Sequence, residues 1–434
     1  MSARFLRSIG QGALIVDFIL YLRALDWSAV TIGVLLAAAG LAGTILMLGS
    51  GVLSDRFGRR PFLLGYQAAT AVGALAVVLH PRSWVLVAVA VLLGYGRGAN
   101  GVAGPFGPVE QAWLAQSVEP ARRGQAFSFN GALGFWGMGV GSLLGAAVPW
   151  FARLLPGTGA YEPLFVLSMV VAVVNLLQVA SIHGADLPPR AGAPPAEAVL
   201  VCHSGRAAGA DGGRAPRREL GSAADPAGVD RLGKDGEREV RRRENVAMAL
   251  LTAVNAVNAM GIGLFSPLLP YWLSVRYGVG SGAIGSIYGL TFLLTGISSI
   301  ATGELTIRIG LVRAVVWVRL LGVVLLAAMP LMPSYGWAAA LYVARSVFNR
   351  GSAGARQAFG VGLVRDERKG LASSLNGLSM RLPSAVGPAL AGWLMEGGSL
   401  GLPFYLAAGL QLLYVVLFGT VLGRYERSAG VGTS

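Results

Sequence analysis

Long apolar stretches separated by short polar turns dominate the pattern of this chain. Each of twelve stretches has the roughly 20 mostly apolar residues that a helix needs to cross a bilayer. The stretches are continuously apolar and lack the alternation of barrel strands, so the pattern predicts an all-α membrane protein. We expect the twelve spans at residues 8–25, 29–52, 61–79, 84–114, 124–151, 161–182, 245–273, 281–303, 312–332, 335–360, 370–396 and 402–423.

The segment 183–244 interrupts this pattern. It contains eleven basic and ten acidic residues, together with Gly, Ala and Pro, and shows no apolar periodicity. Such a balanced, weakly apolar composition is typical of disorder. We therefore expect an N-terminal bundle at 1–182, a disordered cytoplasmic linker at 183–244 and a C-terminal bundle at 245–434. Glu237 to Glu244 is predicted to form a short charged helix that leads into the seventh span.

The two halves of the chain match each other at a fixed offset. Asn130-Gly131 corresponds to Asn376-Gly377, and Arg122-Arg123-Gly124 corresponds to Arg368-Lys369-Gly370, both at an offset of 246 residues. Two parallel repeats of six spans predict two six-helix bundles related by a pseudo-two-fold axis along the membrane normal. This is an architecture of transporters.

The net charge of +14 does not indicate a nucleic-acid partner, because the basic residues gather in alternate loops, beginning with Arg4 and Arg7 before the first span. That asymmetry follows the positive-inside rule and predicts that both termini are cytoplasmic, in a multi-pass protein of the plasma (inner) membrane. Tryptophans agree with an interfacial belt at the outer ends of spans: Trp27, Trp84, Trp150, Trp272, Trp337 and Trp393.

The sequence contains no residue pattern typical of a metal site or an enzyme active site. Cys202 is its single cysteine, and the three histidines lie in or beside loops, so we expect no metal and no cofactor. No zinc-protease, nucleophile-elbow or ATP-binding motif is present. A polytopic membrane enzyme or a non-transporting sensor is therefore a remote alternative.

A basic turn between spans 2 and 3 carries the most specific motif. Gly51-x-x-x-Asp55-Arg56-x-Gly58-Arg59-Arg60 resembles motif A of the major facilitator superfamily at every defining position, and Gly303 to Gly310 repeats part of it. With the repeat and the central linker, the resemblance covers essentially the whole chain. It implies a gate at the cytoplasmic side, in which Asp55 faces the N-terminus of span 11. We expect Glu110, near the cytoplasmic end of span 4, to pair with the arginines of this motif. The alternative is a turn that only sets topology.

Arg97-Gly98-Ala99-Asn100-Gly101 on span 4 resembles motif B of proton-coupled members, with Asn in place of Gln. An arginine this deep in an apolar span needs a partner, and Asp17 on span 1 is the acid near mid-membrane. We expect Asp17 and Arg97 to couple transport to protons. The alternative is a static ion pair between spans 1 and 4.

Further polar and aromatic residues inside the spans are candidates for a substrate cavity. Asn255 and Asn258 share one face of span 7, as do Arg345 and Asn349 on span 10. Span 5 is rich in glycine, which favours either an exporter motif or close helix packing. The candidates are Tyr21, Asn100, Asn130, Trp136, Asn255, Asn258, Arg345, Asn349 and Arg381.

These residues predict a secondary active transporter that exports small organic molecules in exchange for protons, and that works as a monomer in the lipid bilayer. An importer or exchanger of organic anions or sugars is the alternative, favoured by Arg345 and Arg381 and by the absence of the Gly-Pro pair of the exporter motif from span 5.

We predict that segment 183–244 is dispensable for the membrane fold. Because it has no apolar face to bury, a Gly/Ser linker of equal length should leave the yield of folded protein and the transport rate near those of the parent. Size-exclusion chromatography in detergent and a transport assay would measure both. Loss of folded protein would show that the segment packs on the bundles.

Overall fold

In the computed structural model, the chain is described at residues 2–96, 110, 114, 118, 123–181, 226–309, 311–351 and 369–422. Within these ranges only the backbone is described at 51–57, 59, 123–125, 128, 226–240, 243, 300–309, 311–315, 350–351, 369–374 and 421–422. Two compact units are distinguished, one formed by Met1–Ile182 with Ala247–Ser434 and one by His183–Val246.

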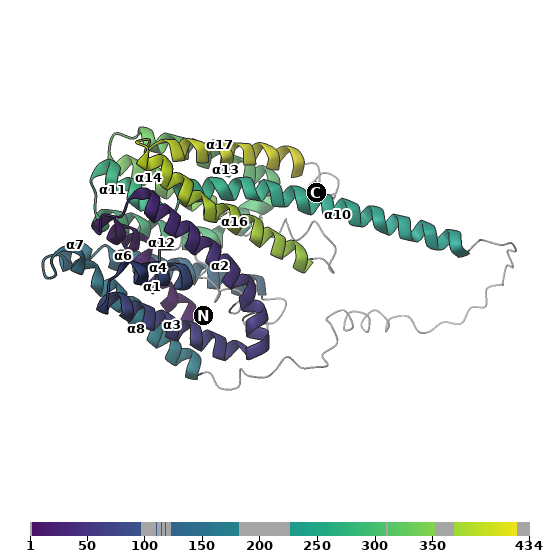
Figure 1. Cartoon of the computed structure of the whole chain (residues 1–434). Coiled ribbons are helices and arrows are strands. Elements are labelled where there is room, and N and C mark those ends of the chain that lie inside the picture. The colour runs from purple at the N-terminus through teal and green to yellow at the C-terminus, as the bar shows by residue number, and fades with distance from the viewer. Residues whose placement is uncertain are drawn as a thin grey trace. The chain divides into compact units, whose positions relative to one another are not determined.

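The described part of the chain is helical and contains no strand. The N-terminal half comprises α1 (Ser2–Ala24), α2 (Ala29–Phe57), α3 (Arg59–Leu79), α4 (Ser83–Ala88), the π-helix η1 (Val89–Leu93), α6 (Arg123–Gly145), α7 (Val148–Phe151), the 3₁₀ helix η3 (Gly157–Tyr161) and α8 (Glu162–Ser181). The C-terminal half comprises α10 (Pro226–Phe265), α11 (Leu269–Tyr277), α12 (Ser281–Ile309), α13 (Leu311–Ala328), the 3₁₀ helix η4 (Met329–Leu331), α14 (Tyr335–Gly351), α16 (Lys369–Glu396), α17 (Leu402–Leu417) and the π-helix η6 (Phe418–Leu422) (Figure 1).

Each of the twelve predicted spans contains a helix, which confirms the all-α membrane architecture. Among the described residues, eight helices are long and apolar enough to cross a bilayer, and two shorter apolar helices occupy Ser83–Leu93 and Val316–Leu331. Some predicted spans are broken for local reasons. Pro267, which has no backbone amide hydrogen, lies between α10 and α11, and Gly94 ends η1 with a positive φ of 80°.

Two boundaries differ from the sequence prediction. The helix α10 begins at Pro226, well before the predicted start at Glu237, and runs on without a break. Proline suits the first turn of a helix, because its fixed φ is helical and its missing amide hydrogen is not needed there. Likewise, α1 begins at Ser2, so Arg4 and Arg7 are buried helix residues and do not lie in a loop.

A seam of small residues joins α1 to α6. A Cβ at Gly141 would collide with the backbone of Ile9 and Ala13, and a Cβ at Gly137 with the backbone of Phe5. These glycines lie one turn apart, so the two backbones approach closely along the whole contact. Of the two interpretations of the glycine-rich fifth span, close packing is the one that these contacts support.

The two halves meet along two more seams of this kind. Helix α2 runs beside α16, where Gly33 lies against the carbonyl of Pro388 and Gly40 lies against Ala385 (Figure 1). Helix α6 runs beside α12, where a Cβ at Gly139 would lie 2.8 Å from Leu293. Both contacts depend on glycine, because larger side chains would hold the helices apart.

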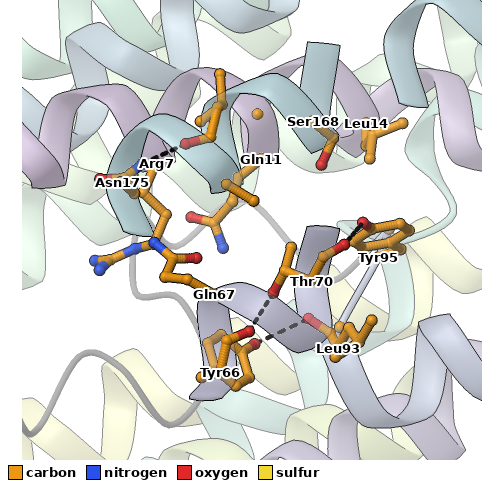
Figure 2. A pocket seen from close by; sticks show the side chains of 15 residues that line it. Arg7, Gln11, Leu14, Tyr66, Gln67, Thr70, Leu93, Tyr95, Ser168 and Asn175 are labelled. Atoms are coloured by element: carbon orange, nitrogen blue, oxygen red, sulfur yellow. Dashed lines mark hydrogen bonds between the residues drawn. The ribbon is translucent and has the colours of Figure 1, made fainter. Parts of the chain in front are cut away.

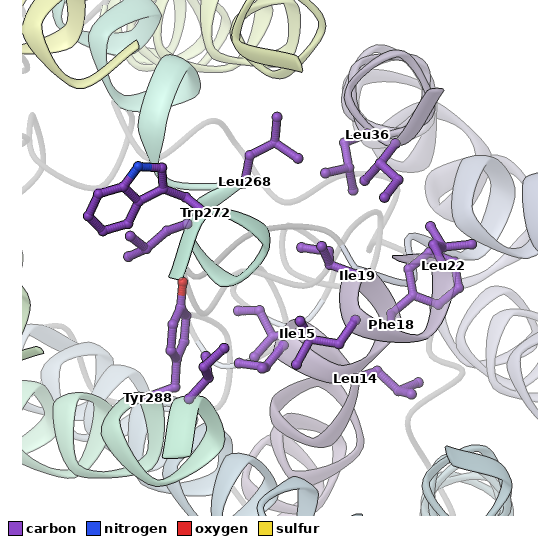
Figure 3. Close-up of a cluster of buried hydrophobic side chains, with 14 of the residues drawn as sticks. Leu14, Ile15, Phe18, Ile19, Leu22, Leu36, Leu268, Trp272 and Tyr288 are labelled. Atoms are coloured by element: carbon purple, nitrogen blue, oxygen red, sulfur yellow. The ribbon is translucent and has the colours of Figure 1, made fainter. Parts of the chain in front are cut away.

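An apolar core fills the space between the halves. Ile15 and Ile19 of α1 lie in one buried cluster with Leu36 of α2, Trp272 of α11 and Tyr288 of α12 (Figure 3). Trp272 is only 1% exposed and its ring centre lies 4.4 Å from that of Phe404. It is therefore a core residue, and the prediction that it belongs to an interfacial belt is wrong. Trp84, Trp150, Trp337 and Trp393 are exposed, as a belt requires.

The seam between α1 and α6 predicts a position-specific effect of adding one methyl group. Gly141→Ala should destabilise the protein by about 1–3 kcal/mol, because the new Cβ meets backbone that cannot rotate away. The matched control is Gly131→Ala on the same helix, where a Cβ meets nothing within 4 Å. That variant should be neutral or slightly stabilising, since Ala is the better helix former. Thermal unfolding in detergent would compare the two variants. Equal melting temperatures would argue against the seam.

Candidate functional site

Asp17 is the most isolated charged group in the described part of the chain. It lies on α1, is 1% exposed, and neither carboxyl oxygen has a hydrogen-bond partner among the described residues. Gly145 of α6 lies directly beside it, because a Cβ there would overlap Oδ2. The predicted partner Arg97 and the neighbouring Asn100 lie outside the described residues. A carboxyl group in such surroundings is a functional candidate by default.

Tyr21, one turn from Asp17, belongs to the interior of the N-terminal bundle. Its ring centre lies 5.5 Å from those of Tyr161 and Phe165, in an aromatic cluster that also includes Phe18 and Tyr95. The structure therefore places Tyr21 in packing contacts within one bundle.

Glu110 is the centre of a buried ionic cluster. It accepts a hydrogen bond of 2.5 Å from Nη2 of Arg7 and lies 3.7 Å from Nη1 of Arg4. Asn130 of α6 donates its amide to the other carboxyl oxygen at 3.0 Å. Arg4 and Arg7 are 7% and 6% exposed, so the carboxylate balances charge in a place where an unpaired cation would be costly. Glu110 and Asn130, two predicted site residues, are thus brought together by arginines of α1.

This arrangement differs from the expected pairing of Glu110 with the basic turn. Of that turn's arginines, Arg60 donates to the carbonyl of Ala180 on α8 at 2.5 Å. Gly58 forms the turn itself with a φ of 89°. The side chains of Asp55, Arg56 and Arg59, and any contact at Gly51, lie outside the described residues, so the proposed gate stays a prediction.

A polar cavity of about 50 Å³ lies beside this cluster, inside the N-terminal bundle (Figure 2). Arg7, Gln11 and Asn175 line one side, and Tyr66, Gln67 and Thr70 line the other. Gln67 and Asn175 are 2% and 0% exposed, and Nε2 of the former and Oδ1 of the latter have no hydrogen-bond partner among the described residues. The cavity is polar and roomy enough to hold several water molecules.

The C-terminal bundle buries two arginines in a network of amides, carbonyls and rings. Arg345 donates to the carbonyl of Gly322 at 3.2 Å and to Gln411 at 2.9 Å, and its guanidinium lies 4.2 Å from the ring centre of Phe265. Arg319 donates to Oδ1 of Asn258 at 3.3 Å and lies over the ring of Tyr414. Sequence reasoning missed Arg319 and Gln411, although an arginine in the middle of a strongly apolar span is itself a signal.

The remaining candidates for the substrate cavity lie on different helices and contact different neighbours. Asn255 donates to Asn376, the repeat counterpart of Asn130, at 2.6 Å. Trp136 packs against Gly296 of α12, where a Cβ would overlap its indole ring. Asn349 is buried against Gly322, and Arg381 is partly exposed on α16. In the described part of the chain, no group of three His, Cys, Asp or Glu residues is placed to hold a metal ion.

Polar contacts close one end of the interface between the halves, which we call the α1–α2 end after the connection at residues 25–28. Arg23 of α1 donates to the hydroxyl of Ser274 on α11 and lies 5.9 Å from the ring centre of Tyr271. The backbone amide of Val30 donates to Glu396 of α16 at 2.9 Å. This bond and one from the hydroxyl of Ser28 lower the pKa of the exposed Glu396 carboxyl.

The sequence of both repeated halves matches the profile of one known family. The profile of the Major Facilitator Superfamily matches residues 1–255 and again residues 251–432. The chain belongs to the Major Facilitator Superfamily. It is therefore an integral membrane protein and a secondary transporter of small molecules, not an enzyme.

Curated relatives within the superfamily match part of the chain. Multidrug resistance protein MdtH of Cronobacter sakazakii is 28% identical over 177 residues, which are 37% of this chain and 42% of that protein. The class G tetracycline resistance protein of Vibrio anguillarum is 31% identical over 145 residues, 33% of each chain. The matched region thus spans less than half the length of these relatives.

Solved structures of the superfamily share the whole fold at low identity. A structure of proton dependent oligopeptide transporters has a TM-score of 0.69 at 13% identity, over 98% of both chains. The nucleoside transporter NupG has a TM-score of 0.68 at 10% identity, over 96% of this chain and 97% of that one. At these identities the likeness establishes the fold alone.

The ionic cluster around Glu110 predicts a large loss of stability when its charge is removed. Glu110→Gln should cost about 3–5 kcal/mol, because Arg4 and Arg7 stay buried without this carboxylate. Glu162→Gln is the matched control: the same substitution at an exposed helix end should cost less than about 1 kcal/mol. Adding Arg7→Met to Glu110→Gln should restore part of the loss. Thermal unfolding in detergent measures all three variants, and equal losses for the two Glu→Gln changes would refute a structural role of the cluster.

Proposed function

We propose that this transporter exports small organic molecules in exchange for protons, by alternating access between its two bundles. It works as a monomer in the plasma membrane, with both termini in the cytoplasm and the α1–α2 end outside. The positive-inside pattern of the loops supports this orientation.

The proposal rests on the buried surroundings of the Asp17 carboxyl. A carboxyl group that is 1% exposed and has no hydrogen-bond partner among the described residues is poorly stabilised as an anion. Protonation therefore strongly changes the interaction energy between the Asp17 side chain and its surroundings, as a proton-coupling site requires. Asp17 also lies on a helix whose side chains reach both the interior of its own bundle and, through Arg23, the other bundle.

Export is supported by the relatives, which are named for resistance to multiple drugs and to tetracycline. The apolar core between Ile15, Ile19 and Trp272 offers an outer closure that would hold a substrate cavity shut toward the outside. The proposed direction of transport is supported by the names of these relatives and not by the fold, because the fold is shared with structures of several substrate classes.

A second candidate is an importer or exchanger of organic anions or sugars. It is favoured by the two buried arginines of the C-terminal bundle, Arg319 and Arg345. Structures similar to this chain include a nucleoside transporter and a D-xylose-proton symporter. The hydrogen bonds of Arg345 to Gly322 and Gln411 weigh against it, because they orient the guanidinium within its own bundle.

Substrate-driven proton movement in proteoliposomes tests the proposal. Tetracycline and a panel of cationic and anionic compounds would be added, and the internal pH recorded. Asp17→Asn should abolish proton movement while leaving substrate binding measurable, because the amide keeps the shape of the carboxyl and cannot ionise. Asp26→Asn is the matched control at an exposed turn nine residues on, and Asn tolerates the positive φ of 59° found there. Unchanged proton movement in Asp17→Asn would place the coupling site elsewhere, and transport of anions alone would favour the second candidate.

A further inference from the structure

Asp17 lies where its own bundle meets the other one. On one side it touches Gly145, the last residue of α6. On the other side lies the start of α12 in the C-terminal bundle: Gly282 faces the carbonyl of Ala146, the residue after Gly145, and the hydroxyl of Ser281, the first residue of α12, acts on the carboxyl of Asp17. The absence of a side chain at Gly145 is what leaves room for the carboxyl at this meeting point.

Ser281 has the properties of a partner for this carboxyl. It is 4% exposed, and its hydroxyl has no hydrogen-bond partner among the described residues. The first backbone amides of a helix lack partners within the helix, and the helix dipole makes this end attractive to an anion. Among the described residues, Asp17 is thus a buried carboxyl without a hydrogen-bond partner, placed near the N-terminus of a 29-residue helix of the opposite bundle.

The start of α12 is held firmly in this place. A Cβ at Gly285 would lie 2.8 Å from the carbonyl of Ser142, and one at Gly282 would lie 3.1 Å from Pro149. The end of α6 and the start of α12 are therefore in close contact next to Asp17. A change in how strongly Asp17 attracts Ser281 acts directly on the contact between the bundles.

Besides Ser281, described residues of η3, α1 and α6 contribute to the surroundings of Asp17. From η3, the hydroxyl of Tyr161 interacts with Ser281 and with the charge of Asp17. From α1, Arg23 acts on the same hydroxyl. From α6, Gly145 brings no charge. Among these groups Ser281 is the one that belongs to the other bundle and acts on the carboxyl itself.

We propose that Ser281 and the N-terminus of α12 hold the ionised Asp17 across the bundle interface and so keep the α1–α2 end closed. A proton on Asp17 removes the attraction and releases this end. Ser281 is thus a positioning residue for coupling, and the inference rests on the proposed role of Asp17. The contacts of Arg23 with Ser274 and of Val30 with Glu396 close the same end and do not involve the carboxyl of Asp17.

Distance measurements between two spin labels would test this directly, without substrate. Labels at Leu154 and Leu331, each 68% exposed and on opposite bundles at the α1–α2 end, would be introduced as cysteines in a Cys202→Ser background. The distances would be recorded at a higher and a lower pH, and in the parent the fraction with a long distance should be larger at the lower pH, where Asp17 takes up a proton. In Asp17→Asn that fraction should be high at both values.

The Ser281 variants distinguish coupling from packing. Ser281→Ala should raise the open fraction about tenfold at the higher pH, because the attraction between the Ser281 hydroxyl and the ionised carboxyl is lost, and leave it unchanged at the lower pH. Ser281→Thr keeps the hydroxyl and should restore the behaviour of the parent. Ser286→Ala is the control on an exposed position of the same helix and should change nothing. An equal effect of Ser281→Ala at both pH values, or none at either, would overturn the inference.

The two proposals fail in different ways. If Asp17→Asn abolishes substrate-driven proton movement while the Ser281 variants behave as the parent, export stands and the role of α12 is refuted. If opening depends on pH through Asp17 and Ser281 while substrate moves no protons, the closure mechanism stands and coupled export is refuted.

Discussion

The close approach of α1 and α6 is the constraint on which the rest of this structure depends. Gly137 and Gly141 let the two backbones touch, so the side chains of α1 that would otherwise interdigitate with α6 are directed elsewhere. Ile15 and Ile19 enter the core between the halves, and Asp17 occupies the space beside Gly145. A larger residue in this seam would move the charged group that the proposed mechanism uses.

The two bundles stabilise their buried polar groups in different ways. In the N-terminal bundle, Glu110 balances arginines of α1 and a polar cavity lies alongside. In the C-terminal bundle, Arg319 and Arg345 are held by amides, a carbonyl and aromatic faces. The first solution places opposite charges together, while the second spreads a positive charge over neutral partners. The two halves therefore share a fold without sharing the chemistry of their interiors.

Sequence alone predicted most of the fold, because membrane spans are long, apolar and bounded by charged turns. It also singled out Asp17, because an acidic residue inside an apolar span is conspicuous from sequence alone. The sequence-based prediction was wrong for charged residues near the end of a span, because such residues can lie either in a loop or within the helix. Arg4 and Arg7 were assigned to a loop, since basic residues beside a span are usually cytoplasmic, yet both lie within α1 and bind Glu110. Ser281 could not be found in this way either, because a serine at a helix start has an ordinary capping role and only the fold places it beside Asp17.

The two seams between the halves have a mechanical consequence. Where α2 meets α16, Gly33, Gly40 and Gly392 lie against alanine and main-chain atoms. Where α6 meets α12, long side chains fill the glycine positions, as Trp136 does at Gly296 and Leu293 does at Gly139. A sliding movement at the second seam has to withdraw these side chains from the spaces above the glycines, whereas the first seam presents no such obstacle at its glycines. The two seams therefore resist a relative movement of the bundles unequally.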